Sequence, residues 1–337
     1  MTLRDRLERW LERLWEGRAP RGLALVWLPL ALAALCTRFA SWRRRRHPRR
    51  PAPLPVVSVG NLRVGGSGKT QIVMELCRRA AVAGLAPAVV LRGHGGRERG
   101  PALLSNGDAD RFGDEAVLLE RRLARTAVIV ARDRWAGVEL ARSAGCSWVV
   151  LDDGLQQRAV EPSHDVVVLP AESPWGNGRL LPLGPLRDPR ASLSGRELLW
   201  LHGEGDGTGV DAPVRSRSRA AGFVPAGDLF AELLAKVPAP AAAFAGIGRP
   251  DRFFRTLESA GLALAAAWPL ADHRSFTVAE LRRAERLARE AGAACLVCTE
   301  KDAVRLPRGL DLGLPLFSLR VDLVIERGQG EVEALFR

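Results

Sequence analysis

Cysteine is scarce in this chain, and its scarcity excludes one class of protein. Five cysteines in 337 residues are too few for a disulfide scaffold, so we expect a reducing, cytoplasmic setting. No zinc-binding pattern occurs, and Cys295 and Cys298 lie in an apolar run that predicts buried core thiols. Hydrophobic residues make up 47% and charged residues 26%, which excludes a disordered or multispan membrane protein. The length predicts about two domains.

Lysine is scarcer still. The chain has 50 Lys and Arg residues, of which only three are lysines, at positions 69, 236 and 301, and the other 47 are arginines. In a chain so biased toward arginine, a lysine indicates a place where a compact ammonium group is needed. This singles out Lys69.

Acidic residues are few in the first 50 positions, and the basic excess gathers there. This segment holds 13 arginines and four acids, so 13 − 4 = +9 of the total net charge of +12. A basic segment can bind nucleic acid or an anionic membrane surface. Because these arginines flank Gly22–Thr37, a stretch without charge, we expect an anionic membrane surface as the partner and no nucleic acid.

The uncharged stretch is short for a membrane span. Its 16 residues would extend about 24 Å as a helix, whereas the hydrocarbon core is about 30 Å thick. The run Arg43–Arg46 follows it and would keep the rest of the chain in the cytoplasm. The long acid-containing stretch before it argues against a signal peptide. Three interpretations stay open: a spanning helix, a helix in the interface, and a buried helix beside solvated arginines.

A strand, a glycine-rich loop and a helix then follow in the order of a P-loop. Pro55–Val59 reads as a buried strand and Ile72–Ala83 as a helix, with Lys69 and Thr70 between them. Such a loop binds phosphate through backbone N–H groups and the helix N-terminus. The strict pattern has glycine where this chain has Arg63. The candidate cofactor-binding residues are Arg63, Val64, Gly65, Gly66, Ser67, Gly68, Lys69 and Thr70.

A second strand ends in two acids. Ser147–Leu151 is apolar and precedes Asp152 and Asp153. A buried strand of this kind can deliver a carboxylate to Mg²⁺ beside the phosphates. Strands alternate with helices over this part of the chain, which predicts an α/β fold with a mostly parallel, P-loop NTPase-like sheet. Asp114 and Glu115 open another predicted helix, where the helix dipole alone would favour acids.

The chain is expected to have three parts. Residues 1–50 form the membrane-associated segment, 51–235 a P-loop kinase domain, and 236–337 a second, smaller α/β lobe. Residues 202–227 are polar and rich in Gly, Ser and Arg, and are expected to form surface loops and weak strands.

Taken together, the motifs of this chain resemble those of the tetraacyldisaccharide 4′-kinase family, the lipid A 4′-kinases. No single motif is decisive, but their order and spacing over some 250 residues are specific, and the family tolerates the missing glycine at position 63. The motifs are VGN…GGSGKT (59–70), RGHGG (92–96), GDE (113–115), DDGLQ (152–156), GNGRLLPLGPLRDP (176–189), GIGRPDRFF (246–254), DH (272–273) and TEKDAVRL (299–306).

The resemblance implies a kinase of lipid A biosynthesis. It would transfer the γ-phosphate of ATP, with Mg²⁺, to the 4′-hydroxyl of tetraacyldisaccharide 1-phosphate and give lipid IVA. The lipid substrate would place the enzyme at the cytoplasmic face of the bacterial inner membrane. No obligate protein partner is implied.

The resemblance also implies roles for single residues. Asp114 matches the catalytic aspartate and His273 its histidine partner, while Lys69 and Arg187 would bind phosphate charge. The implied metal ligands are Thr70, Asp152, Asp153 and Glu115. The chain departs from the family at His94, Gln157, Asp188 and Arg274, none of which is a residue with an implied role.

Three other functions are weaker. A P-loop GTPase would need an Asn-Lys-x-Asp signature, which Thr299–Asp302 matches only in part. A membrane-associated P-loop ATPase switch that binds protein partners would carry a lysine at the position of Val64. A non-enzymatic lipid-binding scaffold would leave Lys69 and the two aspartates without a purpose.

Overall fold

The computed structural model describes residues 24–46, 48–248, 250–270, 276–307 and 309–337, together with Leu11, Arg13 and Trp15. The chain divides into two compact units, and each is described here by itself. Unit 1 comprises residues 1–89, 133–217 and 325–337, and unit 2 comprises residues 90–132 and 218–324. The three-part division of the chain at residues 50 and 235 stays a prediction.

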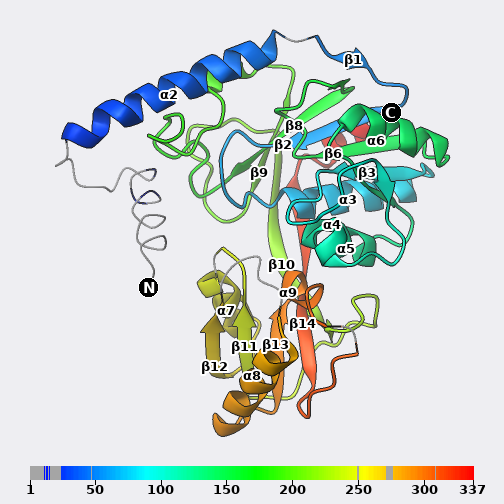
Figure 1. Cartoon of the computed structure of the whole chain (residues 1–337), viewed down its shortest axis with the longest axis vertical. Coiled ribbons are helices and arrows are strands. Elements are labelled where there is room, and N and C mark those ends of the chain that lie inside the picture. Colours follow the sequence, from blue (N-terminus) through cyan, green and yellow to red (C-terminus); the bar gives the residue numbers. More distant parts are fainter. Residues whose placement is uncertain are drawn as a thin grey trace. The chain divides into compact units, whose positions relative to one another are not determined.

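Unit 1 is built on parallel strands, as the sequence predicts (Figure 1). Strand β2 (Val56–Gly60) pairs in parallel with β6 (Trp148–Asp152) on one side and with β8 (His164–Pro170) on the other. The strand order is β10-β9-β8-β2-β6-β3, with β3 at Pro87–Leu91, β9 at Leu198–His202 and β10 at Val214–Pro225. Every residue of β2, β3 and β6 is buried, as expected for a parallel sheet covered on both faces.

The helices of unit 1 pack on these strands through apolar stripes. Helix α3 (Lys69–Val82) buries Ile72, Leu76 and Cys77, which recur at helical spacing. Helix α6 (Arg134–Ser143) begins at an Asp133 cap, whose carboxylate accepts from the N–H groups of Trp135 and Ala136. The remaining short elements are β1 (Arg50–Pro51), β7 (Val160–Glu161), η1 (Arg190–Ser192), α10 (Gln329–Glu333) and η2 (Ala334–Phe336).

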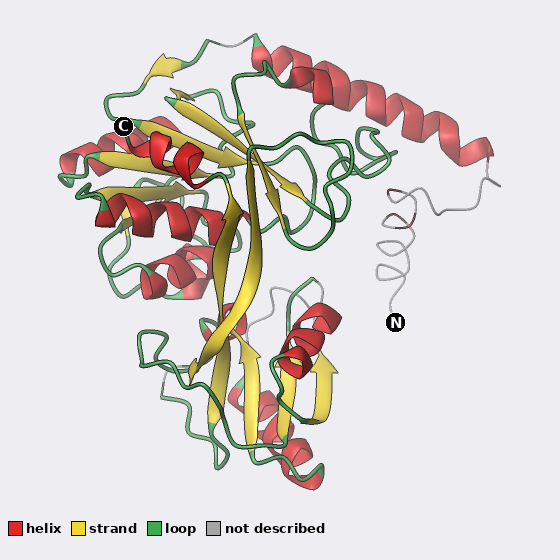
Figure 2. Cartoon of the chain, turned by 180° about the vertical axis from the view of Figure 1, so that it is seen from behind, coloured by secondary structure: helices red, strands yellow, loops and turns green. Residues whose placement is uncertain are grey.

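Unit 2 repeats the α/β plan around other strands. Its sheet has the order β12-β11-β13-β14-β10, and the pairs β11–β12, β11–β13 and β13–β14 are parallel. Helices α7 and α8 lie on it (Figure 2). Side chains of α7 pack with Ala241, Ala243 and Ala245 of β11, whereas Ala288 of α8 packs with Ala242. Successive strand residues point to opposite faces, so the two helices cover opposite faces of the sheet.

Unit 2 is an α/β lobe, as the sequence predicts for residues 236–337, and it also includes residues 90–132. The helices are α4 (Ala109–Phe112), α5 (Asp114–Arg122), α7 (Pro250–Ser259), α8 (Val278–Glu290) and α9 (Glu300–Ala303). The strands are β4 (Ala102–Leu103), β5 (Ala127–Val130), β11 (Ala241–Ala245), β12 (Leu264–Pro269), β13 (Cys295–Thr299) and β14 (Leu316–Arg327). Cys295 and Cys298 are buried, free thiols, as predicted.

One segment differs from the sequence expectation. Residues 214–225 form β10, a strand of 12 residues, where loops and weak strands were expected. The first half of this strand alternates small buried residues with arginines, so it lacks the apolar signal of a strand. Ser216 is fully buried, and its hydroxyl oxygen accepts a hydrogen bond from Trp200 Nε1 at 2.7 Å.

Helix α2 (Ala24–Arg45) continues past the uncharged run into the arginines. In the part of the chain that the structure describes, no helix is both long enough and apolar enough to cross a bilayer. Leu32, Leu35, Phe39 and Trp42 are 47–63% exposed, and their spacing places them on one face. We call these four residues the exposed stripe.

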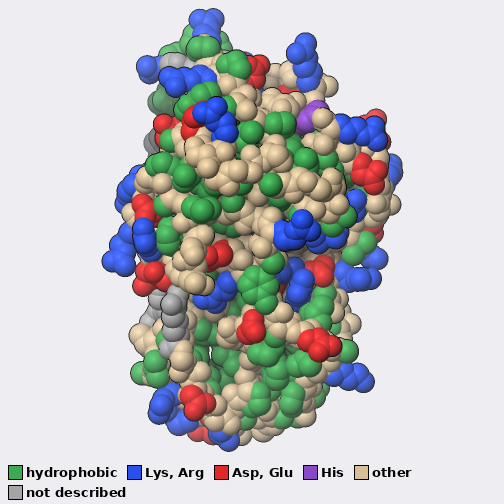
Figure 3. All heavy atoms as spheres, turned by 90° about the vertical axis from the view of Figure 1, so that its right-hand side faces the viewer, with side chains coloured by type: hydrophobic (Ala, Val, Ile, Leu, Met, Phe, Trp, Pro, Cys, Tyr) green, Lys and Arg blue, Asp and Glu red, His purple; other side chains and the backbone are tan. Residues whose placement is uncertain are grey.

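On the protein face shown in Figure 3, basic and acidic side chains are interspersed.

The end of β2 gives a first prediction. A Cβ on Gly60 would lie 2.4 Å from Leu155 Cβ and 2.8 Å from Leu155 N. Gly60→Ala should therefore lower the free energy of unfolding by about 1–3 kcal/mol, measured by urea denaturation. The control is Gly330→Ala in α10, where an added Cβ meets no atom within 4 Å. It should stabilise the helix by about 0.5–1 kcal/mol, and equal losses in both variants would contradict the packing argument.

Candidate functional site

The glycine-rich loop joins the end of β2 to the start of α3. Val59 pairs with Asp152 across the two parallel strands, so the loop and the acids of β6 leave the sheet at the same edge. Gly68 precedes Lys69 with φ 77°, a left-handed conformation that favours glycine. The first turn of α3 carries no acid, and its N–H groups and dipole favour an anion.

His202 packs directly against this loop. A Cβ on Gly68 would lie 2.2 Å from His202 Cδ2, so only glycine fits above the ring. His202 is buried at the end of β9, and its Nδ1 lies 2.9 Å from Ser216 Oγ. Sequence reasoning missed this residue. Its one sequence signal is a histidine that ends a buried strand.

Asp153 forms ion pairs with two basic side chains beside the loop. Its carboxylate lies 3.4 Å from Lys69 Nζ and 3.0 Å from Arg187 Nη1. Partial burial by itself raises the pKa of Asp153, but the charges of Lys69 and Arg187 outweigh it and hold that pKa below its usual value. Asp153 also has φ 53°, which is uncommon for a residue other than glycine and often marks a functional site.

The first residues of the loop are fastened to the Gly-Pro-Leu-Arg segment. Val64 N donates to Pro185 O at 2.9 Å, and Arg187 N donates to Leu62 O at 2.7 Å. The guanidinium of Arg63 donates to Ser173 O. Arg63 therefore serves a structural contact at the position where the strict pattern has glycine. Gly65 and Gly66 lie beyond this anchored part, and an added Cβ on either would meet no atom within 4 Å.

Polar side chains tie the DDGLQ segment to the loop. Gln156 Nε2 donates to Asn61 O at 2.9 Å and to Asp188 Oδ2 at 3.1 Å. Asn61 Nδ2 in turn donates to Ser67 Oγ at 3.0 Å. Loop and acids are thus held as one assembly inside unit 1.

Asp152 is 5% exposed, and its backbone oxygen accepts from Arg134 Nη2 at 2.8 Å. Thr70, in the first turn of α3, supplies a hydroxyl oxygen. Across the described residues, no cluster of three or more His, Cys, Asp or Glu side chains could hold a metal ion. Thr70, Asp152 and Asp153 are oxygen donors of the kind that suits Mg²⁺, which usually completes its coordination with waters and substrate phosphates.

Asp114 and Glu115 lie in unit 2, at the start of α5. Their position depends on close backbone packing. A Cβ on Gly113 would lie 2.3 Å from His94 O, and one on Gly96 would lie 2.6 Å from Gly113 N. Gly93 and Gly96 of RGHGG are therefore required by contact, because an added Cβ would lie 2.8 Å from Phe112 O and 2.6 Å from Gly113 N, respectively.

Both acids of α5 are paired with residues of the TEKDAVRL segment. Arg305 Nε and Nη2 lie 2.7 and 2.6 Å from Asp114 Oδ2, and Lys301 Nζ lies 2.7 Å from Glu115 Oε1. Sequence reasoning treated this segment as a family motif and as a partial match to a GTPase signature, and it missed these contacts. Basic residues within it were the available signal, but their partners are almost 200 positions away.

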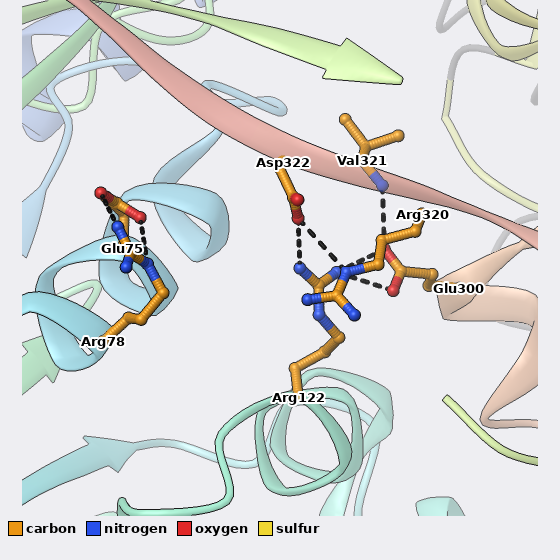
Figure 4. Close-up of polar contacts among 7 residues, drawn as sticks. All are labelled: Glu75, Arg78, Arg122, Glu300, Arg320, Val321 and Asp322. Carbon is orange, nitrogen blue, oxygen red and sulfur yellow. Dashed lines mark hydrogen bonds and ion pairs between the residues drawn. The ribbon is translucent and has the colours of Figure 1, made fainter. Parts of the chain in front are cut away.

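A third ion pair joins the other end of α5 to the same segment. Arg122 Nη1 donates to both oxygens of Glu300 at 2.6 and 2.7 Å, and its Nη2 donates to Asp322 of β14 at 2.7 Å (Figure 4). Burial raises the pKa of Glu300 above its ordinary value, although the Arg122 charge opposes the shift.

The predicted site residues therefore fall into two groups. Unit 1 brings Lys69, Asp153 and Arg187 together beside Asp152 and the loop. Unit 2 places Asp114 and Glu115 at the start of α5. His273 lies outside the described residues.

Arg122 gives a stability prediction. Arg122→Met leaves the buried carboxylate of Glu300 without its main cation and should cost about 3–5 kcal/mol of unfolding free energy near neutral pH. The exposed residue Arg125 provides the control, since Arg125→Met should change stability by less than about 0.5 kcal/mol.

The cost of Arg122→Met should depend on pH. Without the cation, burial raises the native pKa of Glu300 further above its unfolded value of about 4.3. A carboxyl group with a raised native pKa stabilises the fold below the unfolded pKa, and this contribution is lost as pH rises through the native pKa. Both proteins share the unfolded pKa, and the pKa of Glu300 is already raised in the wild type. The deficit relative to wild type should therefore be constant at low pH and grow as pH rises above the wild-type native pKa toward the higher native pKa of the variant. A deficit independent of pH would show that lost packing, rather than charge, causes it.

Comparison with known proteins agrees with these motifs. Residues 24–336 match the family model of tetraacyldisaccharide-1-P 4′-kinase. A tetraacyldisaccharide 4′-kinase of Anaeromyxobacter dehalogenans is 40% identical, covering 96% of this chain and 93% of that protein. One of Gluconacetobacter diazotrophicus is 41% identical over 82% and 84%. The crystal structure of LpxK from Aquifex aeolicus in complex with ATP superposes with a TM-score of 0.70 at 23% identity over the full length of both chains, which shows a shared fold.

Proposed function

The chain belongs to the tetraacyldisaccharide-1-P 4′-kinase family, and we propose that it transfers the γ-phosphoryl group of ATP to the 4′-hydroxyl of tetraacyldisaccharide 1-phosphate, which gives lipid IVA. The bond between the γ-phosphorus and the oxygen bridging to ADP breaks, a bond from that phosphorus to the 4′-oxygen forms, and the hydroxyl proton passes to a base on the protein. Besides family membership, the observation that carries the proposal is the Lys69–Asp153–Arg187 cluster at the start of α3.

The cluster provides two positive charges of the kind that bind the phosphates of a nucleoside triphosphate. Lys69 and Arg187 already share one anion, the carboxylate of Asp153. We assign both cations to phosphate oxygens of ATP, and the backbone N–H groups of residues 65–70 to the same phosphates. Phosphoryl transfer depends mainly on positioning and charge neutralisation, and these residues supply both.

The acids receive two roles. Thr70, Asp152 and Asp153 would hold Mg²⁺, which neutralises charge on the phosphates when bound. Glu115 is the fourth proposed ligand, and it would have to exchange its contact with Lys301 for the ion. Asp114, together with His273, is assigned to accept the proton of the 4′-hydroxyl.

Helix α2 is proposed to attach the enzyme to the cytoplasmic face of the inner membrane, where the acylated substrate resides. Its exposed stripe is apolar, and Arg46 lies 3.9 Å over the Trp42 ring at the end of that stripe. An apolar face bordered by arginines is typical of a helix that lies in a membrane interface and contacts anionic lipid.

Phosphate transfer tests the function directly. Purified protein is mixed with labelled ATP, Mg²⁺ and detergent-dispersed tetraacyldisaccharide 1-phosphate, and the lipid product is counted. Lys69→Ala should lower kcat by at least about 100-fold, because it removes charge from the transferring group. Lys236→Ala removes an exposed lysine and should leave the rate unchanged. ATP hydrolysis without transfer to the lipid would instead favour a P-loop ATPase switch.

Flotation with vesicles that contain anionic lipid tests the membrane contact. Leu35→Glu with Phe39→Glu places two charges on the exposed stripe and should abolish co-flotation. Ala33→Glu with Ala40→Glu adds the same charge to exposed positions of α2 outside the stripe, and should weaken binding much less. Equal losses in both double variants would show that net charge rather than the apolar face determines binding.

A further inference from the structure

The TEKDAVRL segment, residues 299–306, has no role in the function proposed so far. We propose that Arg305 of this segment is a positioning residue for phosphoryl transfer, which fixes the carboxylate of Asp114 in the one orientation used in the reaction. The inference deepens the proposed function and rests on the catalytic role assigned there to Asp114.

Two nitrogens of Arg305 contact one carboxylate oxygen of Asp114, and both side chains are largely buried. Arg305 Nε and Nη2 lie 2.7 and 2.6 Å from the same oxygen, Asp114 Oδ2. The side chain of Arg305 is 2% exposed and that of Asp114 is 15% exposed. Nε donates a hydrogen bond to Oδ2, and Nη2 adds an ion-pair contact to the same oxygen. Because Oδ2 is held, rotation of the carboxyl group of Asp114 is restricted.

Arg305 is itself held from its other side. Its Nη1 donates to Gly246 O at 2.9 Å and lies 3.4 Å from Asp302 Oδ1. Asp302, whose side chain is fully buried, also accepts from Gly246 N at 3.1 Å and from the Thr299 hydroxyl at 2.6 Å. Thr299 is the N-cap of α9. A chain of buried and part-buried hydrogen bonds therefore connects the end of β13 to the carboxylate of Asp114.

The Arg305–Asp114 contact does more than attach α5 to residues 299–306. Arg122 joins the same helix to the same segment through Glu300, but it lies at the opposite end of α5 from Asp114. Arg122 and Arg305 both join α5 to this segment through side chains less than 10% exposed. Of these two arginines, Arg305 is the one that contacts the proposed catalytic carboxylate. Arg122 is the matched control.

Orientation of a reacting group affects rate strongly, since a displacement of about 1 Å can cost about 100-fold. Loss of Arg305 should therefore lower kcat and leave KM for ATP nearly unchanged, because the contacts assigned to ATP lie in unit 1. Arg305→Lys restores the charge but offers a single nitrogen instead of a fork, so it should recover part of the lost kcat.

The test is a double-mutant cycle in the full-length enzyme, with kcat, KM for ATP and thermal unfolding measured for each variant. Arg305→Met should lower kcat by about 100-fold, and Arg305→Lys by less. In the Asp114→Asn background, where the carboxylate is already lost, Arg305→Met should cause no further loss. Arg122→Lys should lower the unfolding temperature but retain kcat.

Two results would overturn the inference. One is a full, multiplicative loss from Arg305→Met in the Asp114→Asn background, and the other is an equal loss of kcat in Arg122→Lys. If Arg305→Met does not fold, the comparison of Arg305→Lys with Arg122→Lys decides in the same way. An unchanged kcat in Asp114→Asn would instead rule out the catalytic role of Asp114, and with it the positioning role of Arg305. If wild type transfers phosphate and Asp114→Asn does not, the proposed function holds whatever the result for Arg305.

Discussion

The parallel pairing of β2 with β6 is the constraint on which the candidate phosphate site depends. Val59 and Asp152 are partners in this register, so the chain leaves both strands at one edge of the sheet. A shift of one residue would turn every side chain of β6 to the opposite face and move Asp152 away from the loop. The buried, branched residues of both strands hold the register, and the position of the acids follows from it.

Close backbone contacts then fix the loops that hold the candidate site residues. Gly60 lies against Leu155, Gly68 lies against His202, and Gly113 lies against the backbone of His94. In each case a Cβ would displace a neighbour, so these glycines are required by contact as well as by conformation. The same principle explains Arg63. Its guanidinium bonds to a carbonyl of a distant loop, so this position contributes to anchoring the loop instead of surrounding an anion.

The candidate acids of both units are paired with basic side chains, but the pairs differ between the two units. In unit 1, Asp153 lies among cations that the proposed mechanism assigns to substrate phosphate, and its contacts would exchange on binding. In unit 2, Arg305 and Lys301 hold Asp114 and Glu115 through residues that come late in the chain. The unit 1 contacts are partly exposed and exchangeable, and the Lys301–Glu115 pair, 31% and 34% exposed, would exchange in the same way. The Arg305–Asp114 pair is the more buried contact, and it is the one proposed to stay in place.

The sequence by itself determined the α/β class, the strands and the helix on either side of the loop, the acids of β6 and the family, because these depend on local patterns and on motif order. It also indicated Lys69, through the rarity of lysine. It did not show the strand at 214–225, since small and basic residues conceal its alternation. Nor did it show His202 beneath Gly68, or Arg122 and Arg305 beside the acids that they bind. Such contacts join residues far apart in the chain, and only the packing of strands and helices decides which distant charges meet.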